Sequence, residues 1–153
     1  MLRKRTMLVT LMATVLVLSA VAVASATDPS GLTNVLIGRG QASRSFEVNQ
    51  HRGNDVAVSQ ITVQPAGSSG WHSHPGTTVI ALQSGQLTLF SERIAGGKCR
   101  VHTYTAGQVF LEHPNKEYNT VNTGSEPYVL AVTFFNVPHG ASFRIDQDDP
   151  GNC

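Results

Sequence analysis

Charged residues are scarce in this 153-residue chain, where Asp, Glu, Lys and Arg together make up 14% of the sequence. Three of the eleven basic residues, Arg3, Lys4 and Arg5, lie together near the N-terminus. No other basic cluster follows them, so the sequence offers no patch for nucleic acid. It also lacks a basic amphipathic helix of the kind that lies on membrane surfaces. The composition therefore indicates no charged macromolecular partner.

Several catalytic motifs are missing as well. The chain has neither the Gly-x-Ser-x-Gly nucleophile elbow of α/β-hydrolases nor a glycine-rich phosphate loop. It shows no internal repeat of about 20–50 residues, which excludes solenoids and propellers. The chemistry has to be sought in other residue types.

The first 26 residues have the pattern of a secretory signal peptide. A basic start precedes an apolar run at residues 7–23 and an Ala-Ser-Ala cleavage site at residues 24–26. The apolar run is shorter than the roughly 20 residues that span a bilayer, so we favour cleavage over a membrane anchor. Cleavage leaves residues 27–153 as one domain with eight basic and ten acidic residues, a formal charge of −2. We expect a secreted, extracytoplasmic bacterial protein.

Only two cysteines occur, Cys99 and Cys153. Their spacing is not the Cys-x-x-Cys of a zinc or redox site. In an exported protein an even number of cysteines favours a disulfide, and Cys99 with Cys153 is the one intramolecular pairing. Two free thiols, or an intermolecular bond from the C-terminal cysteine, are the alternatives.

Short strands separated by glycine turns predict an all-β fold of about ten antiparallel strands. Residues 77–83 and 86–93 are expected to form a hairpin with Gly85 at positive φ. A change of parity between Val58 and Ile61 predicts a bulge or a two-sided strand. The pattern alone does not distinguish an immunoglobulin-like sandwich from a jelly-roll barrel. The expected strands are 35–37, 44–48, 55–64, 77–83, 86–93, 98–105, 108–112, 118–122, 128–135 and 142–145.

The clearest chemistry lies in residues 71–76, Trp-His-Ser-His-Pro-Gly. Side chains two positions apart on an extended backbone share a face, so His72 and His74 point the same way. Two neutral imidazoles on one face are a ready pair of metal ligands. A metal site needs a third ligand, and His113, on the turn after strand 108–112, is the available nitrogen.

This stretch resembles the first motif of the cupin superfamily, which has a glycine, His-x-His, a glutamate three or four residues on, and a glycine after six more. Gly67 lies one residue nearer His72 than in the family, and Gly85 falls at the expected place. Thr78 occupies the position of the glutamate.

Residues 107–122 resemble the second cupin motif. Counted from its first glycine, Tyr118 stands where the family has its metal histidine, and Asn122 stands at the closing asparagine. The resemblance therefore implies a single-domain cupin-type jelly-roll β-barrel.

The resemblance also implies a site inside the barrel. Cupins with the full motifs hold Fe, Mn, Zn, Ni or Cu with three histidines and a glutamate, and substrate or O₂ takes the open positions. Here only His72 and His74 are carried over. Thr78 offers a neutral hydroxyl, a poor ligand for these metals, and a Tyr118 phenolate is costly at a resting pKa near 10. We expect Thr78 and Tyr118 to line the pocket and Trp71 to cap its mouth.

Each of these residues also has a purely structural interpretation. His72 and His74 could line a metal-free pocket, and His113 could face solvent on its turn. Tyr118 could fill volume in the barrel. Glu112, at the end of its strand, is expected to be a solvated charge.

Two functions fit these observations. The first is a secreted cupin that binds a small molecule, with a weakly held divalent metal at His72 and His74 and no turnover. The second is a metal-dependent oxygenase or isomerase acting on a small organic molecule. The incomplete ligand set favours the first. A purely structural surface protein stays open, since fold does not dictate function, and so does a homodimer, because many cupins pair through their sheets.

Overall fold

The computed structural model describes residues 29–91, 97–151 and 153. The predicted signal peptide lies outside these residues. The chain divides into two units, Met1–Asn34 and Val35–Cys153. Residues 29–34, the described part of the first unit, are exposed and form neither helix nor strand. No helix capable of crossing a membrane occurs in the described part of the chain.

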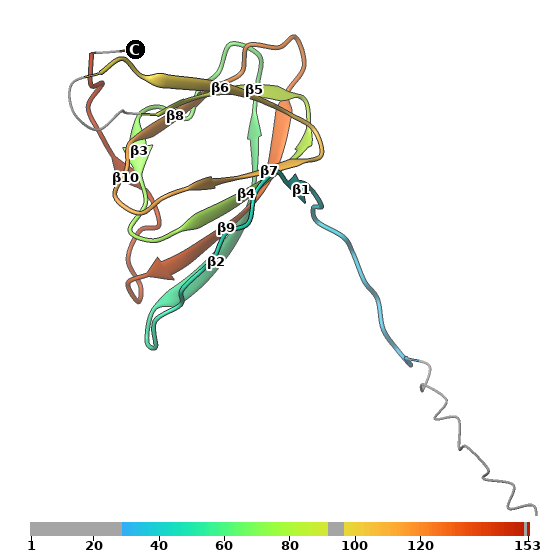
Figure 1. Ribbon diagram of the computed structural model, residues 1–153. Helices are drawn as coiled ribbons and strands as arrows, with labels where there is room; N and C mark the ends of the chain where they lie inside the picture. Colours follow the sequence, from blue (N-terminus) through green and yellow to red (C-terminus); the bar gives the residue numbers. More distant parts are fainter. Residues whose placement is uncertain (1–28, 92–96, 152) are drawn as a thin grey trace, which may run out of the picture. The chain divides into compact units, whose positions relative to one another are not determined.

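The second unit is built from two five-stranded sheets that face each other (Figure 1). Only the pairing of β1 with β7 is parallel; every other pairing of these strands is antiparallel. The first sheet has the order β1 (Gln41–Ala42), β7 (Gln108–Glu112), β4 (Thr78–Ser84), β9 (Tyr128–Val137), β2 (Asp55–Val63). The second has the order β10 (Ile145–Asp146), β3 (His72–Ser73), β8 (Tyr118–Val121), β5 (Gln86–Ser91), β6 (Arg100–Thr105). The predicted all-β jelly-roll fold is confirmed.

Strand positions near the N-terminus differ from the prediction. Segments 35–37 and 44–48 form no strand, although their β-branched and aromatic residues favour one. Val35 is 77% exposed and has no neighbouring strand to pair with in this unit. Propensity without a partner edge does not make a strand. Two short strands that were not predicted, β1 and β3, form elsewhere.

The predicted hairpin at Gly85 is wrong. β4 belongs to the first sheet and β5 to the second, so the chain crosses between sheets at this glycine instead of folding back on itself. Gly85 does have the expected positive φ of 76°. Its backbone also packs so closely that a Cβ would lie 2.7 Å from the carbonyl oxygen of Pro127. The glycine is needed for a corner of the barrel.

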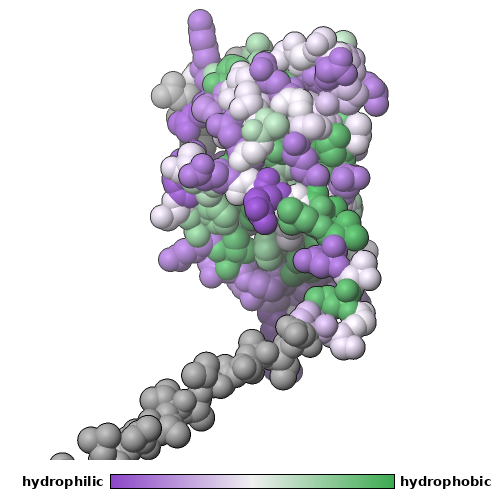
Figure 2. Space-filling view, turned by 90° about the vertical axis from the view of Figure 1, so that its right-hand side faces the viewer, coloured by the Kyte–Doolittle hydropathy of each residue, from purple (hydrophilic) through white to green (hydrophobic). Residues whose placement is uncertain are grey.

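The core lies between the two sheets because alternate side chains of each strand point inward. On β9, for example, Leu130, Val132 and Phe134 are buried. On β2 the parity change reflects a two-sided strand, since Val58 is 62% exposed while Ile61 packs against the core. Hydrophobic residues also reach the surface on the face that Figure 2 shows, among hydrophilic ones.

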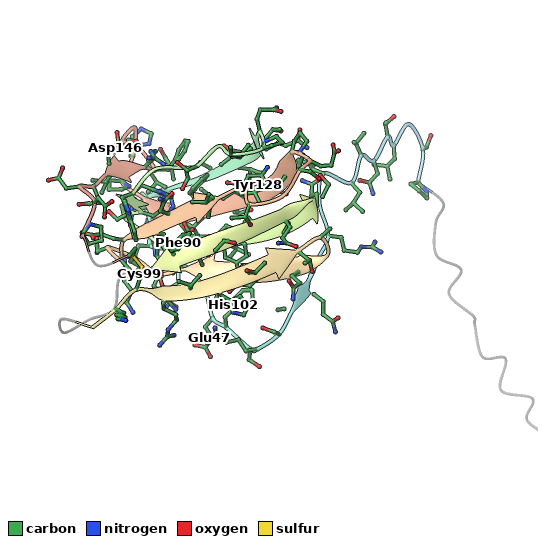
Figure 3. The ribbon with its side chains drawn as sticks, turned by 90° about the horizontal axis from the view of Figure 1, so that it is seen from above. Glu47, Phe90, Cys99, His102, Tyr128 and Asp146 are labelled. Carbon is green, nitrogen blue, oxygen red and sulfur yellow. A yellow bond between two sulfur atoms is a disulfide. The ribbon has the colours of Figure 1, made fainter. Side chains whose placement is uncertain are left out.

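A disulfide joins Cys99 to Cys153, whose Cα atoms lie 5.1 Å apart, so the predicted internal bridge is confirmed. It fastens the end of the chain beside the start of β6, where Figure 3 labels Cys99. A disulfide fits an oxidising compartment.

Candidate metal centre

His72 and His74 lie at the inner surface of the second sheet. The short strand β3 pairs with β8 through His72 and Tyr118, and with β10 through Ser73 and Ile145. Both histidines are buried, and their ring centroids lie 4.9 Å apart. The structure therefore brings the two imidazoles together inside the domain.

Backbone carbonyls fix the orientation of both rings. Nδ1 of His72 lies 2.8 Å from the carbonyl oxygen of Gly70, and Nδ1 of His74 lies 2.6 Å from that of Phe143. A carbonyl can only accept, so each Nδ1 carries a proton and donates it. The neutral rings therefore present Nε2 as a lone pair, which is the arrangement that metal-binding histidines use.

The third member of the group is Glu112, at the end of β7. Its Oε2 lies 2.9 Å from Nε2 of His74 and 3.8 Å from Nε2 of His72. Glu112 is only 3% exposed. One ligand atom from each of these three residues lies within 4.8 Å of the other two.

The contact between His74 and Glu112 needs a proton or a cation. A neutral His74 ring with its proton on Nδ1 offers Nε2 only as an acceptor, and a carboxylate oxygen without a proton also only accepts. Two acceptors 2.9 Å apart in a buried site repel each other unless a proton or a cation lies between them. Burial lowers the pKa of His72, and the charge of Glu112 only partly offsets this. The His72 ring therefore tends to remain neutral, which is the state that binds metals.

Glu112 was expected to be a solvated charge, and that expectation is wrong. The signal that identifies it is strand parity: Phe110 is an apolar residue two positions earlier, so Glu112 shares its inward face. Its place at the end of the strand, beside the turn, suggested exposure to solvent, but strand parity decides its direction.

His113, the expected third ligand, is not brought to the two imidazoles. It follows Glu112 directly, so its side chain has the opposite parity and is exposed. Its backbone N–H donates a hydrogen bond to the hydroxyl of Tyr118 at 2.9 Å. Burial raises the pKa of Tyr118, which keeps the phenol protonated and unsuited to metal binding.

Of the other residues expected to line the pocket, one lines the cavity and two do not. Thr78 is 1% exposed and lines the cavity beside the two histidines. Its Oγ1 has no hydrogen-bond partner among the described residues. Trp71 is half-buried, and its carbonyl oxygen accepts an N–H from Gln147. Neither Trp71 nor Tyr118 lines this cavity.

The cavity has a volume of about 230 Å³. Its walls are mostly apolar side chains, among them Ile80, Leu130 and Val132. The polar groups of His72, His74 and Glu112 lie on its lining, and so does the side chain of Arg144. The site thus combines a cluster of metal ligands with an apolar space for a small molecule.

The loop that carries His74 rests directly on β9. A Cβ on Gly76 would lie 1.8 Å from the carbonyl oxygen of Phe135, which leaves room for no side chain. The backbone N–H of Phe135 also donates to the carbonyl oxygen of Thr77 at 2.9 Å. The loop that carries His74 is therefore held against the longest strand of the domain.

The donor set fits a divalent transition metal. Two imidazole nitrogens and one carboxylate oxygen are ligands that Zn, Fe and Mn accept. A set of three leaves coordination positions for water or a ligand, and Thr78 Oγ1 is a free hydrogen-bonding group in the same cavity.

Comparison with known proteins gives a consistent picture. A family model described as the cupin domain matches residues 59–134. No curated protein sequence matches the chain.

Solved structures that resemble this chain share its fold at low sequence identity. Peruvianin-I, a cysteine peptidase from Thevetia peruviana latex, is 17% identical with a TM-score of 0.50, over 56% of this chain and 53% of its own. Oxalate oxidase in complex with the substrate analogue glycolate is 22% identical with a TM-score of 0.50, over 57% and 45%. Bacillus subtilis oxalate decarboxylase, described with Mn(II) centres, is 22% identical with a TM-score of 0.50, over 66% and 30%. The present chain thus spans about half or less of the length of these proteins.

Proposed function

This chain belongs to the cupin superfamily, and we propose that it binds a divalent transition metal through His72, His74 and Glu112 and holds a small organic ligand beside it. The observation that carries the proposal is the buried cluster in which one ligand atom each from His72, His74 and Glu112 lies within 4.8 Å of the other two. These three residues would hold a divalent cation between them.

The metal supplies a positive charge that polarises an oxygen of the ligand. The chain's own residues orient it: the carbonyls of Gly70 and Phe143 hold the two rings, and Glu112 balances the charge. The buried setting excludes water from the apolar part of the cavity.

The shape and chemistry of the cavity indicate the class of ligand. Its volume of about 230 Å³ suits a small molecule. Apolar walls favour a hydrocarbon body, while the metal ligands, Thr78 Oγ1 and Arg144 offer partners for one polar or anionic end. A small organic carboxylate satisfies both requirements. The complex of oxalate oxidase with glycolate shows that a neighbour of the same fold accepts such a molecule.

Metal analysis of the mature protein tests the proposal. We expect about one divalent metal per chain in protein purified from its native exported compartment, and binding of Zn²⁺, Ni²⁺ or Cu²⁺ by calorimetry. With three protein ligands the binding is weaker than in a cupin with four. His72→Ala and His74→Ala should remove the metal, whereas His51→Ala, an exposed histidine elsewhere, should not. Unchanged metal content in the first two variants would refute the proposal.

A second candidate function is a metal-dependent enzyme, an oxygenase or isomerase. The observation that favours it is the donor set of two histidines and one carboxylate, with which non-haem iron oxygenases hold Fe(II) and leave positions open. Oxygen consumption by the Fe(II)-loaded protein with a panel of small carboxylic acids distinguishes the two functions. Consumption that His72→Ala abolishes supports an oxygenase.

We propose further that the protein acts outside the cytoplasm. The basic and apolar pattern of residues 1–26 and the Cys99–Cys153 disulfide support this. Mass spectrometry of the exported protein should find an N-terminus at residue 27. An intact residue 1 in the exported fraction would contradict the proposal.

A further inference from the structure

A second and larger hollow lies outside the metal cavity. It lies between β6, an edge strand of the second sheet, and the part of the first sheet that contains β1 and β7. Its volume is about 710 Å³, roughly three times that of the metal cavity at about 230 Å³. We call it the seam hollow. The side chains that matter for its chemistry are Arg44, Arg100, His102, Tyr104, His113 and Lys116.

Three separate segments bring these side chains together. Arg100, His102 and Tyr104 alternate along β6 and therefore project from one face of that strand. Arg44 comes from the segment that follows β1, and Figure 3 shows this segment, labelled at Glu47, passing beside the strand that carries His102. His113 and Lys116 come from the turn between β7 and β8 (Figure 1).

Positive charge is concentrated in this hollow. Arg44, Arg100 and Lys116 line it, together with two histidines, and none of the described residues that line it is Asp or Glu. The carboxylate of Glu47 lines the adjoining groove, and Glu112 lines the metal cavity. In the described part of the chain, no ion pair involves Arg44, Arg100 or Lys116.

This concentration is unusual for the chain's composition. Like charges gathered in one hollow repel one another, and an anion in the hollow would relieve that repulsion. The chain as a whole has a formal charge of only +1, so the fold, and not an excess of basic residues, produces the positive hollow.

One wall of the seam hollow is aromatic. The rings of His102 and Tyr104 lie 4.4 Å apart, and Tyr104 stacks on Phe110 with centroids 4.2 Å apart and an angle of 17°. Phe110 does not line the hollow, so His102 and Tyr104 are the rings that a ring-shaped ligand would contact, and the surrounding cations suit acidic groups at the edges of that ligand.

From these observations we propose that the seam hollow is a binding site for a small oligoanion, a molecule with two or more carboxylate, sulfate or phosphate groups on a flat or ring-shaped body. The site is separate from the metal centre, since the two hollows share no lining residue. It depends neither on a bound metal nor on the function proposed above.

Calorimetry with 1,5-naphthalenedisulfonate tests this site in the full mature protein. Sulfonates bind metals poorly, so the metal centre does not contribute. At an ionic strength of about 10 mM, where the Debye length is about 30 Å, the disulfonate should bind about tenfold more tightly than 1-naphthalenesulfonate. Arg44→Gln and Arg100→Gln should each weaken the disulfonate roughly tenfold, because a hydrogen bond to a charged group is lost.

Matched controls separate a site from a general charge effect. Arg39→Gln and Arg52→Gln remove the same charge from exposed positions outside the hollow and should leave affinity unchanged. Equal loss in Arg39→Gln and Arg100→Gln, or equal binding of the mono- and disulfonate, would overturn the proposal. So would loss of binding in the His72→Ala/His74→Ala double variant, which would assign the probe to the metal cavity.

The acidic group of the natural ligand is identified by measurements on the same double variant, because this variant lacks the two histidines that would hold a metal. Inorganic pyrophosphate and benzene-1,3,5-tricarboxylate are compared in it. Tighter binding of the first assigns the hollow to phosphates, and tighter binding of the second assigns it to carboxylates. If neither binds more tightly than 1-naphthalenesulfonate, the proposal is wrong.

Discussion

Thr78 on β4 and Glu112 on β7 lie directly opposite each other in the first sheet. Side chains in such a pair have Cβ atoms about 4.5–5.5 Å apart, so both reach the same part of the cavity. The sequence has a neutral hydroxyl where the cupin motif has its glutamate, and the neighbouring strand brings a carboxylate to the side of that position. The proposed metal centre is thus completed by a residue outside the expected motif position.

Glu112→Gln should weaken metal binding at least about 100-fold, beyond the 10–100-fold that loss of an outer-shell contact costs. Glutamine keeps the shape and can donate to Nε2 of His74, so the fold should persist. Metal titration followed by calorimetry measures the change. His113→Ala is the matched comparison, since this exposed residue lies outside the cluster and should leave affinity unaltered. The reverse ranking of the two variants would assign the third ligand to His113.

Thr78→Glu should raise metal affinity and destabilise the metal-free protein. The new carboxylate supplies a fourth ligand, but without metal it lies buried opposite Glu112, and an uncompensated buried charge costs about 3 kcal/mol. Thermal unfolding with and without Zn²⁺ should show a low melting temperature that the metal restores. Thr77→Glu, one position away on the other face, should show no such rescue. Equal behaviour of the two variants would contradict the proposed geometry.

Asn122→Ala should destabilise the domain by about 3 kcal/mol, because several buried groups lose their hydrogen-bond partner. Asn122 is 2% exposed, and its Nδ2 donates to the carbonyl oxygens of Val63 and Glu126, both at 2.9 Å. Its Oδ1 accepts the N–H of Gly124. Urea unfolding measures the loss. Asn119→Ala, on the other face of the same strand, should change stability far less.

Stability should depend on pH through Asp55 and His139, whose Oδ1 and Nδ1 lie 2.9 Å apart. The hydrogen bond to His139 lowers the pKa of Asp55, and the same bond raises the pKa of His139. The Asp55 contribution is present above about pH 4 and is lost as the pH falls through the lowered value. The His139 contribution is present below about pH 6.5 and is lost as the pH rises through the raised value.

The pair should therefore contribute most between about pH 4 and 6.5. The difference in urea midpoint between the natural protein and His139→Gln should be largest in that window and shrink on both sides. The effect is small and weakened by salt, because the pair is exposed. A difference that stays constant from acid to alkaline pH would exclude the ion pair as its source.

Removal of the disulfide with Cys99→Ser/Cys153→Ser should lower the free energy of unfolding by up to about 4 kcal/mol, because the bridge closes a loop of 54 residues. Urea unfolding of the double variant and of the natural protein gives the difference. A thiol count on the denatured natural protein should find none. One or two thiols per chain would show that the bridge is absent in solution.

Alternation of residues was enough to predict most of the strands and that His72 and His74 share a face, and the resemblance to cupins supplied the inward direction of that face. It was not enough to predict which strands pair. The strands on either side of Gly85 are adjacent in sequence but lie in different sheets, and local sequence contains no direct signal for that choice.

The site was predictable only in part for a related reason. A ligand on β3 can be read from its motif, but Glu112 reaches it from the other sheet across the barrel. Its parity with Phe110 was a usable signal. No sequence signal predicted the positive seam hollow, because its arginines and lysine are distant in sequence and are brought together only by the folding of the barrel.

The absence of a side chain at Gly76 has a consequence for the energetics of binding. Because this loop sits directly on the Phe135 carbonyl, its conformation is already settled when the domain folds. Little entropy should then be lost in this loop when an ion or a ligand binds beside it, so we expect its affinity to reflect contacts and not the cost of ordering the loop. Position 76 would thereby preorganise His74 for binding.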